Sequence, residues 1–208
     1  VLGKRERIGL AALLDVAGQK DTPSAHTLGF MLGPRINASG RIAEADLGLR
    51  LLLSEDAIEA RAMAEKLDEV NKRRQEVEGD MLGTAMAMAE AQVKAGHAVL
   101  LIAAEGWHPG VVGIVAGRVK EKFNRPACVA GIAAGIAKGS GRSVTGIDLG
   151  TAIIAAREMG LLETGGGHPM AAGFSYNAAK GEAFHAFLEE RLAHAARLPS
   201  VADLLVEG

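Results

Sequence analysis

Apolar residues recur at helical spacing in several segments of the first half of the chain. In residues 1–18 they form one face and Gly18 follows the last of them, which predicts a helix that ends at this glycine. The pattern returns in residues 44–53 and stops near Ser54. Between these segments, residues 31–42 (MLGPRINASGRI) are rich in Gly, Pro and Asn, and we expect a loop there.

The longest helical pattern covers residues 54–94, which contain no proline. Its apolar residues recur at intervals of three, four or seven: Met63, Leu67, Val70, Val77, Met81, Ala85 and Met88. Ser54 is the expected N-cap, with Glu55 and Asp56 in the first turn, where the positive end of a helix favours acidic side chains. A helix of about 60 Å is longer than one compact domain needs. The segment therefore predicts a bridge between two lobes.

After Gly96 the pattern becomes that of a compact α/β domain. The apolar run at 98–104 predicts a buried strand, residues 111–123 a helix with Pro109 near its first turn, and residues 126–133 a second strand. This strand–helix–strand unit is expected to be right-handed. The elements expected after it are a loop at 138–146, a helix capped by Asp148, a glycine-rich turn at 163–169, a strand at 170–176 and a helix at 178–197.

Composition narrows the class of protein. The chain has 208 residues, 49% of them hydrophobic, and a net charge of −2, so no global basic field marks a nucleic-acid binder and any such binding needs a local patch. The single cysteine, Cys128, lies in an apolar run and is expected to be an inert core thiol. One cysteine excludes a disulfide framework and agrees with a reducing cytoplasm.

The ends of the chain suggest a piece of a longer protein. The sequence does not begin with Met, has no signal-peptide pattern and stops in mid-pattern at PSVADLLVEG. No apolar stretch reaches the length of a membrane span.

Two loop segments, one in each half of the chain, carry residues suited to phosphate. In GPRINASGR, Arg35 and Arg41 flank Asn37, and a guanidinium fork matches phosphate geometry. A structural turn with two solvated arginines explains this segment as well, and is favoured on local grounds. In GWHPGVVG, Trp107 and His108 lie at a helix N-terminus, where unpaired N–H groups favour anions. A hydrophobic anchor and a capping residue account for them equally well.

Two further segments combine cations with glycine. KGSGRS offers polar side chains around Gly139 and Gly141, whose backbone amides could turn toward an oxyanion. Its candidate ligands are Lys138, Ser140, Arg142 and Ser143. The lysine precedes the glycines, so this is not a Walker loop, and flexible surface loops often have this composition.

In GGGH, the glycines Gly165 to Gly167 could bring bare backbone against a ligand while His168 donates to a phosphate or acts as an acid. A strained turn between a helix and a strand is the alternative.

We find no hydrolytic centre in the sequence. There is no paired Asp/His metal constellation, no serine beside a base and no Cys–His pair, and the aspartates Asp15, Asp21, Asp46 and Asp148 are scattered. The four segments together predict a chain that holds a phosphate-rich ligand while the chemistry happens elsewhere.

Taken in order, these motifs resemble the RecJ single-strand-specific exonucleases of the DHH phosphoesterase superfamily. The resemblance rests on LGPRINASGR (32–41), the long helix, GWHPGVVGIVAGR (106–118), KGSGRSVTGIDL (138–149) and GGGHPMAAGF (165–174), and it covers most of the chain. GGGH is the hallmark of the DHH-associated domain. One small departure is Ser39, where the family often has Ala.

The resemblance implies an α/β fold in which a compact mixed-sheet domain with helices on its faces follows a long connecting helix. Residues 1–53 would be the C-terminal remnant of the metal-binding DHH domain, 54–95 the connecting helix and 96–197 the DHH-associated domain. Residues 198–208 would begin an oligonucleotide-binding domain. The family's Asp and His ligands for two Mn²⁺ or Mg²⁺ ions would lie before Val1, so no metal is expected on this chain alone.

The resemblance also implies roles for individual residues. The strand would be contacted near the metal lobe by Arg35, Asn37 and Arg41, and its phosphates gripped by Ser140, Arg142 and Ser143. Gly166, Gly167 and His168 would face the metal centre, with His168 in a supporting catalytic role. The implied activity of the whole protein is hydrolysis of single-stranded DNA from its 5′ end in repair and recombination. Its partners would be single-stranded DNA and other repair proteins, and no membrane.

Other functions stay open at this point. A DHH-superfamily oligoribonuclease or small phosphoesterase would share these motifs, and a non-catalytic nucleotide-binding module would fit the chain alone. A structural α/β domain with glycine-rich turns is the third alternative. Trp107 and Tyr176 are weak candidates for a base-stacking platform, because aromatic residues make up only 3% of the chain. Contacts should therefore go mainly to the phosphate backbone.

Overall fold

The computed structural model describes residues 4–196, so the segment 198–208 expected to open a further domain lies outside the described residues. The chain divides within a long helix, after Gly79, into two units that are described separately below. Among the helices of the described part, none combines the length and the apolar character needed to cross a membrane.

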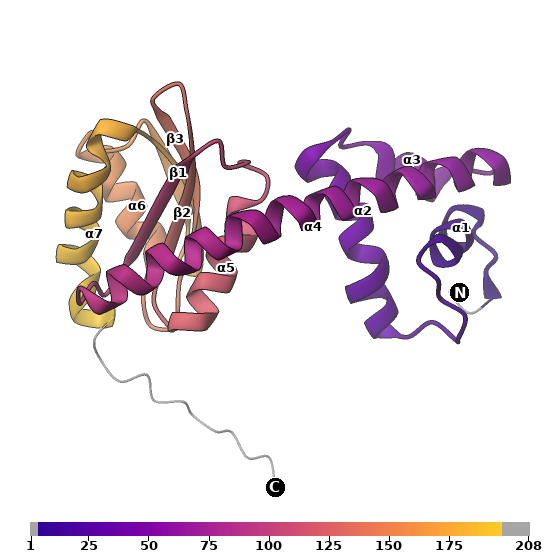
Figure 1. The fold of residues 1–208 in the computed structure, drawn as a ribbon, viewed down its shortest axis with the longest axis horizontal. Coiled ribbons are helices and arrows are strands. Elements are labelled where there is room, and N and C mark those ends of the chain that lie inside the picture. The colour runs from indigo at the N-terminus through magenta and orange to yellow at the C-terminus, as the bar shows by residue number, and fades with distance from the viewer. Residues whose placement is uncertain (1–3, 197–208) are drawn as a thin grey trace, which may run out of the picture. The chain divides into compact units, whose positions relative to one another are not determined.

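The first unit is entirely helical (Figure 1). Its elements are α1 (Ile8–Val16), the π-helical segment η2 (Thr27–Leu32), α2 (Gly33–Ile42), α3 (Leu47–Leu53) and the first part of α4 (Ala57–Lys94). Its core contains Leu13, Leu14, Leu32, Leu51 and Leu67, all almost completely buried. At Gly9 an added Cβ would lie 1.8 Å from the Leu51 carbonyl oxygen, so this glycine lets α1 pack directly on α3.

The loop predicted at residues 31–42 is wrong, because this segment continues from η2 into α2. Pro34 stands in the first turn of α2, where its missing N–H costs no intrahelical hydrogen bond. Ser39 is buried, and its hydroxyl donates to the Ile36 carbonyl one turn earlier. Tertiary burial of one face of α2 therefore outweighs the low helix propensity of its Gly, Pro and Asn residues.

Helix α4 confirms the predicted long helix with a different cap. It has 38 residues, about 57 Å at 1.5 Å per residue. The Asp56 carboxylate accepts from the backbone N–H groups of Ile58 and Glu59, both at 2.8 Å, so Asp56 is the capping residue rather than Ser54.

The second unit is built on a five-stranded mixed sheet with the order β1-β2-β3-β5-β4 (Figure 1). Its elements are β1 (Leu100–Glu105), α5 (Val112–Phe123), β2 (Ala127–Ala133), β3 (Ile136–Arg142), α6 (Leu149–Glu158), β4 (Thr164–His168), β5 (Ala171–Asn177), η3 (Ala178–Lys180) and α7 (Gly181–Ala196). Strands β1 and β2 are parallel and joined by α5, as predicted, whereas the other pairs are antiparallel. Asp148 caps α6, also as predicted, and accepts from the Thr151 N–H at 3.0 Å.

Two predicted loops of this unit are strands. Residues 138–142 belong to β3, and residues 164–168 form β4, which turns at Pro169 and Met170 into β5. The glycines of β3 are required by packing. An added Cβ would lie 2.5 Å from the Phe174 ring at Gly139 and 2.6 Å from Leu149 at Gly141.

The two faces of this sheet have different coverings (Figure 1). One face, called the inner face below, packs on α6 and α7 in a core that includes Phe174, Tyr176, Ile153, Phe184 and Leu188. On the opposite face α5 packs against β2 and β3. Alternate residues of each strand point to opposite faces, so the placement of every strand residue follows from its register.

Candidate phosphate-binding face

The polar residues of β3 and β4 lie on one face of the sheet. Lys138, Ser140 and Arg142 alternate with inner-face residues along β3, and Thr164, Gly166 and His168 do so along β4. Strand β5 lies between them and pairs with both, so the register forms three rows. The rows are Lys138–Ser175–Thr164, Ser140–Gly173–Gly166 and Arg142–Ala171–His168. We call these nine residues the open face.

The centre of the open face is bare backbone. Gly166 and Gly173 are paired in register, and at each of them an added Cβ would meet no atom within 4 Å among the residues described. Ala171 adds only a methyl group beside them. A ligand can therefore approach the peptide groups of β4 and β5 closely, as glycine permits.

Cationic and hydroxyl groups border this bare centre on the side of α5. A Cβ built at Gly113 would lie 3.1 Å from Arg142 Nη2 and 3.4 Å from Ser140 Oγ, so both side chains lie against the first turn of α5. Arg142 Nη1 donates to its neighbour's carbonyl, that of Gly141, at 2.8 Å. A helix N-terminus, a guanidinium and a hydroxyl together favour an anion at this place.

His168 ends β4 at the opposite border, two strands or roughly 10 Å from Arg142. Its Nδ1 accepts from the Met170 N–H at 3.3 Å, so the neutral ring carries its proton on Nε2, which can donate to a ligand. The side chain is exposed, and the Pro169 carbonyl next to it accepts from Leu149 N at 3.1 Å. The start of α6 thus fixes the hairpin turn that presents His168.

A hollow of about 340 Å³ lies at the Lys138 end of the open face. It is lined by Pro109, Val112, Lys138, Gly139, Thr164, Phe174 and Ser175. The hydroxyls of Thr164 and Ser175 are hydrogen-bonded at 2.7 Å on its wall. Thr164 and Ser175 were not among the residues predicted from the sequence. Reading 138–142 and 164–168 as strands would have placed both beside Lys138.

The loop after β1 approaches the same region through Trp107 and His108. The Trp107 carbonyl oxygen would lie 2.0 Å from a Cβ at Gly131, so this loop packs directly on β2. His108 Nδ1 accepts from the Gly110 N–H at 3.1 Å, and its carbonyl accepts from Val112 N. His108 therefore holds the turn before α5, whose N-cap, Val111, makes no side-chain capping hydrogen bond, and Trp107 is half-buried.

Three other candidate residues face elsewhere. Ser143 is buried, and its hydroxyl donates to the Ile147 carbonyl at 2.8 Å. Gly167 belongs to the inner face, where an added Cβ would lie 2.5 Å from the Ala172 Cα. Tyr176 is buried, and burial raises the pKa of its hydroxyl to about 12, so it offers no stacking platform. Cys128 is buried, as expected of a core thiol, and burial raises the pKa of its thiol to about 12.

The arginine and asparagine candidates of the first unit lie on α2. Arg35 Nε donates to Asp68 Oδ1 at 2.8 Å and its Nη1 to the Met31 carbonyl at 2.7 Å, so it joins α2 to α4. Burial opposes ionisation of Asp68, but hydrogen bonds and charges from Lys72 and Arg35 outweigh it and hold its pKa below the usual value. Asn37 and Arg41, four residues apart, share an exposed side of α2.

The residues described do not form a two-manganese centre. Their one group of at least three neighbouring His, Cys, Asp or Glu ligands consists of His97, His185 and Glu189. Mn²⁺ and Mg²⁺ prefer oxygen ligands, and a pair of such ions needs several carboxylates. These three residues therefore do not fit that pair, and we derive no hydrolytic step on this chain.

Comparison with known proteins agrees with this architecture. A model of the DHHA1 domain matches residues 84–194. The single-stranded-DNA-specific exonuclease RecJ of Bacillus subtilis is 42% identical over 180 residues, which cover 85% of this chain and 22% of the relative. RecJ of Thermus thermophilus is 40% identical over 206 residues, 96% of this chain and 29% of the relative.

Solved structures show the same relationship. The crystal structure of Thermus thermophilus RecJ in complex with Mn²⁺ superposes with a TM-score of 0.81 and 37% identity, covering 95% of this chain and 28% of that one. The corresponding complex with Mg²⁺ gives a TM-score of 0.80. The chain thus spans less than a third of the length of these relatives. By its matched residues and its fold, this chain belongs to the DHHA1 domain family and is a homologue of the RecJ exonucleases over their DHHA1 region.

Proposed function

We propose that this chain is the strand-gripping part of a RecJ-type exonuclease, and that its open face binds the sugar–phosphate backbone of single-stranded DNA. The observation that carries the proposal is the register of β3, β5 and β4. It brings Lys138, Ser140, Arg142 and His168 around the bare backbone of Gly166 and Gly173.

The chemistry of the open face supports contacts to phosphate rather than to bases. Lys138 and Arg142 supply positive charge, Ser140 a hydroxyl, and His168 an N–H. The buried Tyr176 and half-buried Trp107 leave little aromatic surface for stacking. Binding should therefore be insensitive to base sequence and should weaken as salt rises, with a slope of about −0.7 per phosphate contacted.

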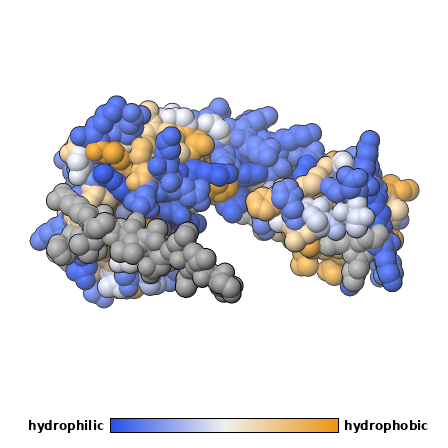
Figure 2. Space-filling model, turned by 90° about the horizontal axis from the view of Figure 1, so that it is seen from below, coloured by the Kyte–Doolittle hydropathy of each residue, from blue (hydrophilic) through white to orange (hydrophobic). Residues whose placement is uncertain are grey.

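The first unit supports the proposal that residues 1–53 are part of a larger metal-binding domain. It exposes several large apolar side chains: Leu28, Phe30, Leu49, Leu53 and Ile58. Phe30 is 72% and Ile58 83% exposed. In Figure 2 hydrophobic residues of this unit, drawn in orange, reach the surface. Apolar surface of this extent favours burial against further protein, and we propose that the rest of the DHH domain covers it.

The proposal assigns different tasks to the candidate residues. Asn37 and Arg41 remain proposed strand contacts in the first unit, whereas we propose that Arg35 is structural because Asp68 and Met31 hold it. His168 is proposed to support catalysis from the open face. The Mn²⁺ or Mg²⁺ ions named for the Thermus thermophilus relatives would be held by residues outside this sequence, and phosphodiester hydrolysis in DNA repair would take place there.

A binding experiment on the 208-residue chain tests the open face. The probe is a 20-nucleotide single strand with a 5′-phosphate and a 3′-fluorophore, followed by fluorescence anisotropy at several salt concentrations. We expect Arg142→Ala to weaken binding roughly tenfold or more, since a hydrogen bond to a charged group contributes about 1.5–3 kcal/mol. Lys122→Ala, which removes one exposed positive charge near the C-terminal end of α5, is the control.

The same assay separates the alternative functions. Equal competition by a dinucleotide and by the 20-nucleotide strand would favour a small phosphoesterase. Unchanged binding in Arg142→Ala would favour a structural domain.

Activity is measured on the full-length gene product with Mn²⁺, in parallel with the 208-residue chain. We expect the short chain to be inactive, the full-length protein to degrade single strands, and full-length His168→Ala to lose roughly a hundredfold in rate. Cleavage by the 208-residue chain itself would contradict this division of labour.

A further inference from the structure

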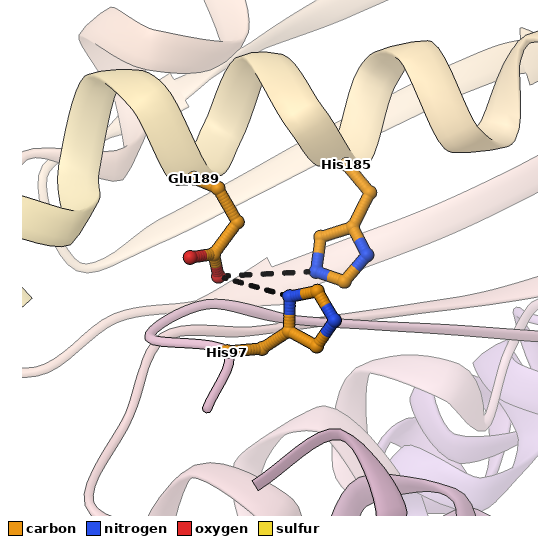
Figure 3. A group of neighbouring side chains, drawn as sticks. All are labelled: His97, His185 and Glu189. Atoms are coloured by element: carbon orange, nitrogen blue, oxygen red, sulfur yellow. Dashed lines mark ion pairs between the residues drawn. The ribbon is translucent and has the colours of Figure 1, made fainter. Parts of the chain in front are cut away.

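A second cluster of polar side chains lies beside β1, at the opposite edge of the sheet from β4. It consists of His97, just before β1, and His185 and Glu189 on α7 (Figure 3). His97 Nδ1 is 3.7 Å and His185 Nε2 4.0 Å from Glu189 Oε1. The two imidazole rings stack with their centres 4.6 Å apart. All three side chains are half-buried.

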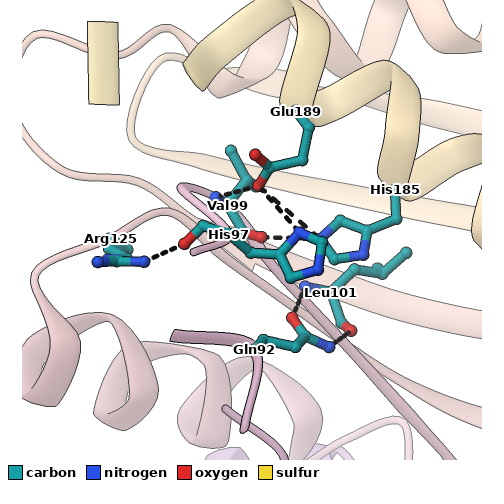
Figure 4. Close-up of polar contacts among 7 residues, drawn as sticks. All are labelled: Gln92, His97, Val99, Leu101, Arg125, His185 and Glu189. Atoms are coloured by element: carbon teal, nitrogen blue, oxygen red, sulfur yellow. Dashed lines mark hydrogen bonds and ion pairs between the residues drawn. The ribbon is translucent and has the colours of Figure 1, made fainter. Parts of the chain in front are cut away.

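Part of this cluster has a structural task. Glu189 Oε1 accepts from Val99 N at 2.6 Å, and His185 Nε2 lies 2.8 Å from the Val99 carbonyl oxygen. In the same way, Gln92 on α4 bonds both the N–H and the carbonyl of Leu101 (Figure 4). These side chains satisfy backbone groups along the edge of β1 that pairs with no strand in the described sheet and would otherwise be open to another strand.

The imidazole of His97 takes no part in that edge contact. Its backbone carbonyl is held by Arg125, while its ring reaches over His185 and points Nδ1 toward Glu189 (Figure 4). The hydrogen bonds to Val99 explain why His185 and Glu189 lie where they do. They do not explain why the imidazole of His97, a third group able to bind a metal, lies beside them. The spacing of His185 and Glu189, four residues apart on α7, is also one that places two ligands on the same side of a helix.

We propose that His97, His185 and Glu189 form a binding site for a transition-metal ion of the zinc class. Two imidazoles and one carboxylate, with water in the fourth position, are a ligand set that Zn²⁺ accepts in tetrahedral geometry. Imidazole ligands disfavour Mg²⁺ and Mn²⁺ relative to Zn²⁺, Co²⁺ or Ni²⁺. The site therefore has a metal preference that differs from that of the manganese chemistry proposed for the full-length protein.

The ligand atoms must move closer together to hold such an ion. Atoms about 2.1 Å from one tetrahedral ion are roughly 3.4 Å apart, whereas the two His–Glu pairs stand at 3.7 and 4.0 Å and the ligand atoms of all three residues lie within 4.8 Å of one another. Glu189 Oε1 faces both imidazoles and also accepts from Val99 N. It can keep that hydrogen bond while it ligates the ion, because a carboxylate oxygen has more than one lone pair. His185 must release its Nε2 proton and its contact with the Val99 carbonyl, so binding should weaken as the pH falls.

A bound ion would tie α7 to the junction between α4 and β1. Its effect would be on stability, because His97 comes from that junction and the other two ligands from α7, so the three exist as a set only in the folded chain.

The test uses the untagged 208-residue chain with Zn²⁺ for calorimetry and thermal unfolding, and with Co²⁺ for its visible d–d absorption. We expect one ion per chain, an intense tetrahedral Co²⁺ spectrum, and a rise in melting temperature of roughly 5–10 °C at a hundred times the dissociation constant. His97→Ala should remove the Co²⁺ spectrum and the thermal shift, yet keep the metal-free melting temperature, because the Val99 contacts remain. His26→Ala, an exposed histidine of the first unit, is the matched control.

Two results would overturn the proposal. Saturating Co²⁺ without a tetrahedral spectrum, or an equal thermal shift in His97→Ala and wild type, would show that the cluster only caps the edge of β1. His185→Gln serves as the second variant, because glutamine can still donate to the Val99 carbonyl. We expect it to fold and to bind the metal at least tenfold more weakly.

Discussion

Neighbouring glycines of β4 face opposite sides of the sheet and differ in what surrounds them. At Gly167, on the inner face, an added Cβ would lie 2.4 Å from the Ala171 carbonyl oxygen, and at Gly165 2.9 Å from Ile153. At Gly166, on the open face, it would meet nothing described within 4 Å. The inner-face glycines are needed for packing, whereas Gly166 leaves backbone bare without any packing demand. The three consecutive glycines therefore have two separate roles: Gly165 and Gly167 allow close packing, and Gly166 leaves the backbone accessible.

The largest expected effect is on the inner face, from Gly167→Ala. The new methyl group would meet backbone atoms of Ala171 and Ala172, which cannot rotate away. We expect the free energy of unfolding to fall by about 2–3 kcal/mol, the upper part of the range for an overpacked site. Urea denaturation followed by the fluorescence of Trp107, the single tryptophan, measures it. A loss below about 0.5 kcal/mol would show that Gly167 is no more constrained by packing than Gly166.

The matched change on the open face is Gly166→Val. The side chain has room, and a β-branched residue suits a strand, so stability should be unchanged or rise by up to about 1 kcal/mol. Binding of single-stranded DNA should fall roughly tenfold, because the side chain fills the space into which a phosphate must come. Anisotropy and urea denaturation on the same sample separate the two effects. Unchanged DNA binding would mean that the bare backbone is not a contact surface.

A smaller effect is expected at the cationic border of the open face. Lys138→Ala should weaken binding about fivefold and reduce the magnitude of the salt slope by about 0.7, the value for one phosphate contact to a single strand. Lys122→Ala removes the same charge away from this face and should leave the slope unchanged. Equal slopes for the two variants would assign the binding to net charge rather than to this surface.

The smallest expected effect concerns the first unit, where the ion pair between Arg35 and Asp68 joins α2 to α4. Asp68 has a lowered pKa in the folded chain, so its contribution is present above its ordinary pKa near 4 and is lost as the pH falls through the lower folded value. Asp68→Asn should cost about 0.5–1 kcal/mol at neutral pH and remove this loss in acid. Hydrogen exchange of the α2 amides at pH 7 and below pH 4 measures both. Equal protection in variant and wild type would mean that the Arg35–Asp68 pair does not stabilise this unit.

The sequence predicted the elements whose hydrophobic pattern is strong. The helix at 57–94 and the unit formed by β1, α5 and β2 follow from apolar periodicity, and they lie within a few residues of the predicted bounds. Strand β3 was missed because its inner-face positions are Ala and Gly rather than large apolar residues. The alternation of small and polar residues lacks the apolar signal by which a strand is predicted. Helix α2 was missed because burial against its unit, which local propensity does not record, holds it helical.

The sequence identified most residues of the candidate site but could not predict how they are arranged in space. Lys138, Ser140, Arg142 and His168 stood out by their chemistry, but their common face depends on the strand pairing of β5 with β3 and β4. Ser143 and Gly167 belong to the same motifs but lie elsewhere. Gly167 is on the inner face because side chains alternate along β4, and Ser143 is buried just after the end of β3. Side chains such as Thr164 and Ser175 become candidates only once that register is known.

The most direct test of the open face is a nuclear magnetic resonance titration of the isotope-labelled chain with a 5′-phosphorylated oligothymidylate. We predict that the largest amide shifts fall on open-face residues, above all Gly166, Gly173, Ser140 and His168. Amides of α6 and α7 behind the inner face should change little. Shifts confined to other surfaces, with Gly166 and Gly173 unmoved at saturation, would contradict the account that this sheet face holds the strand.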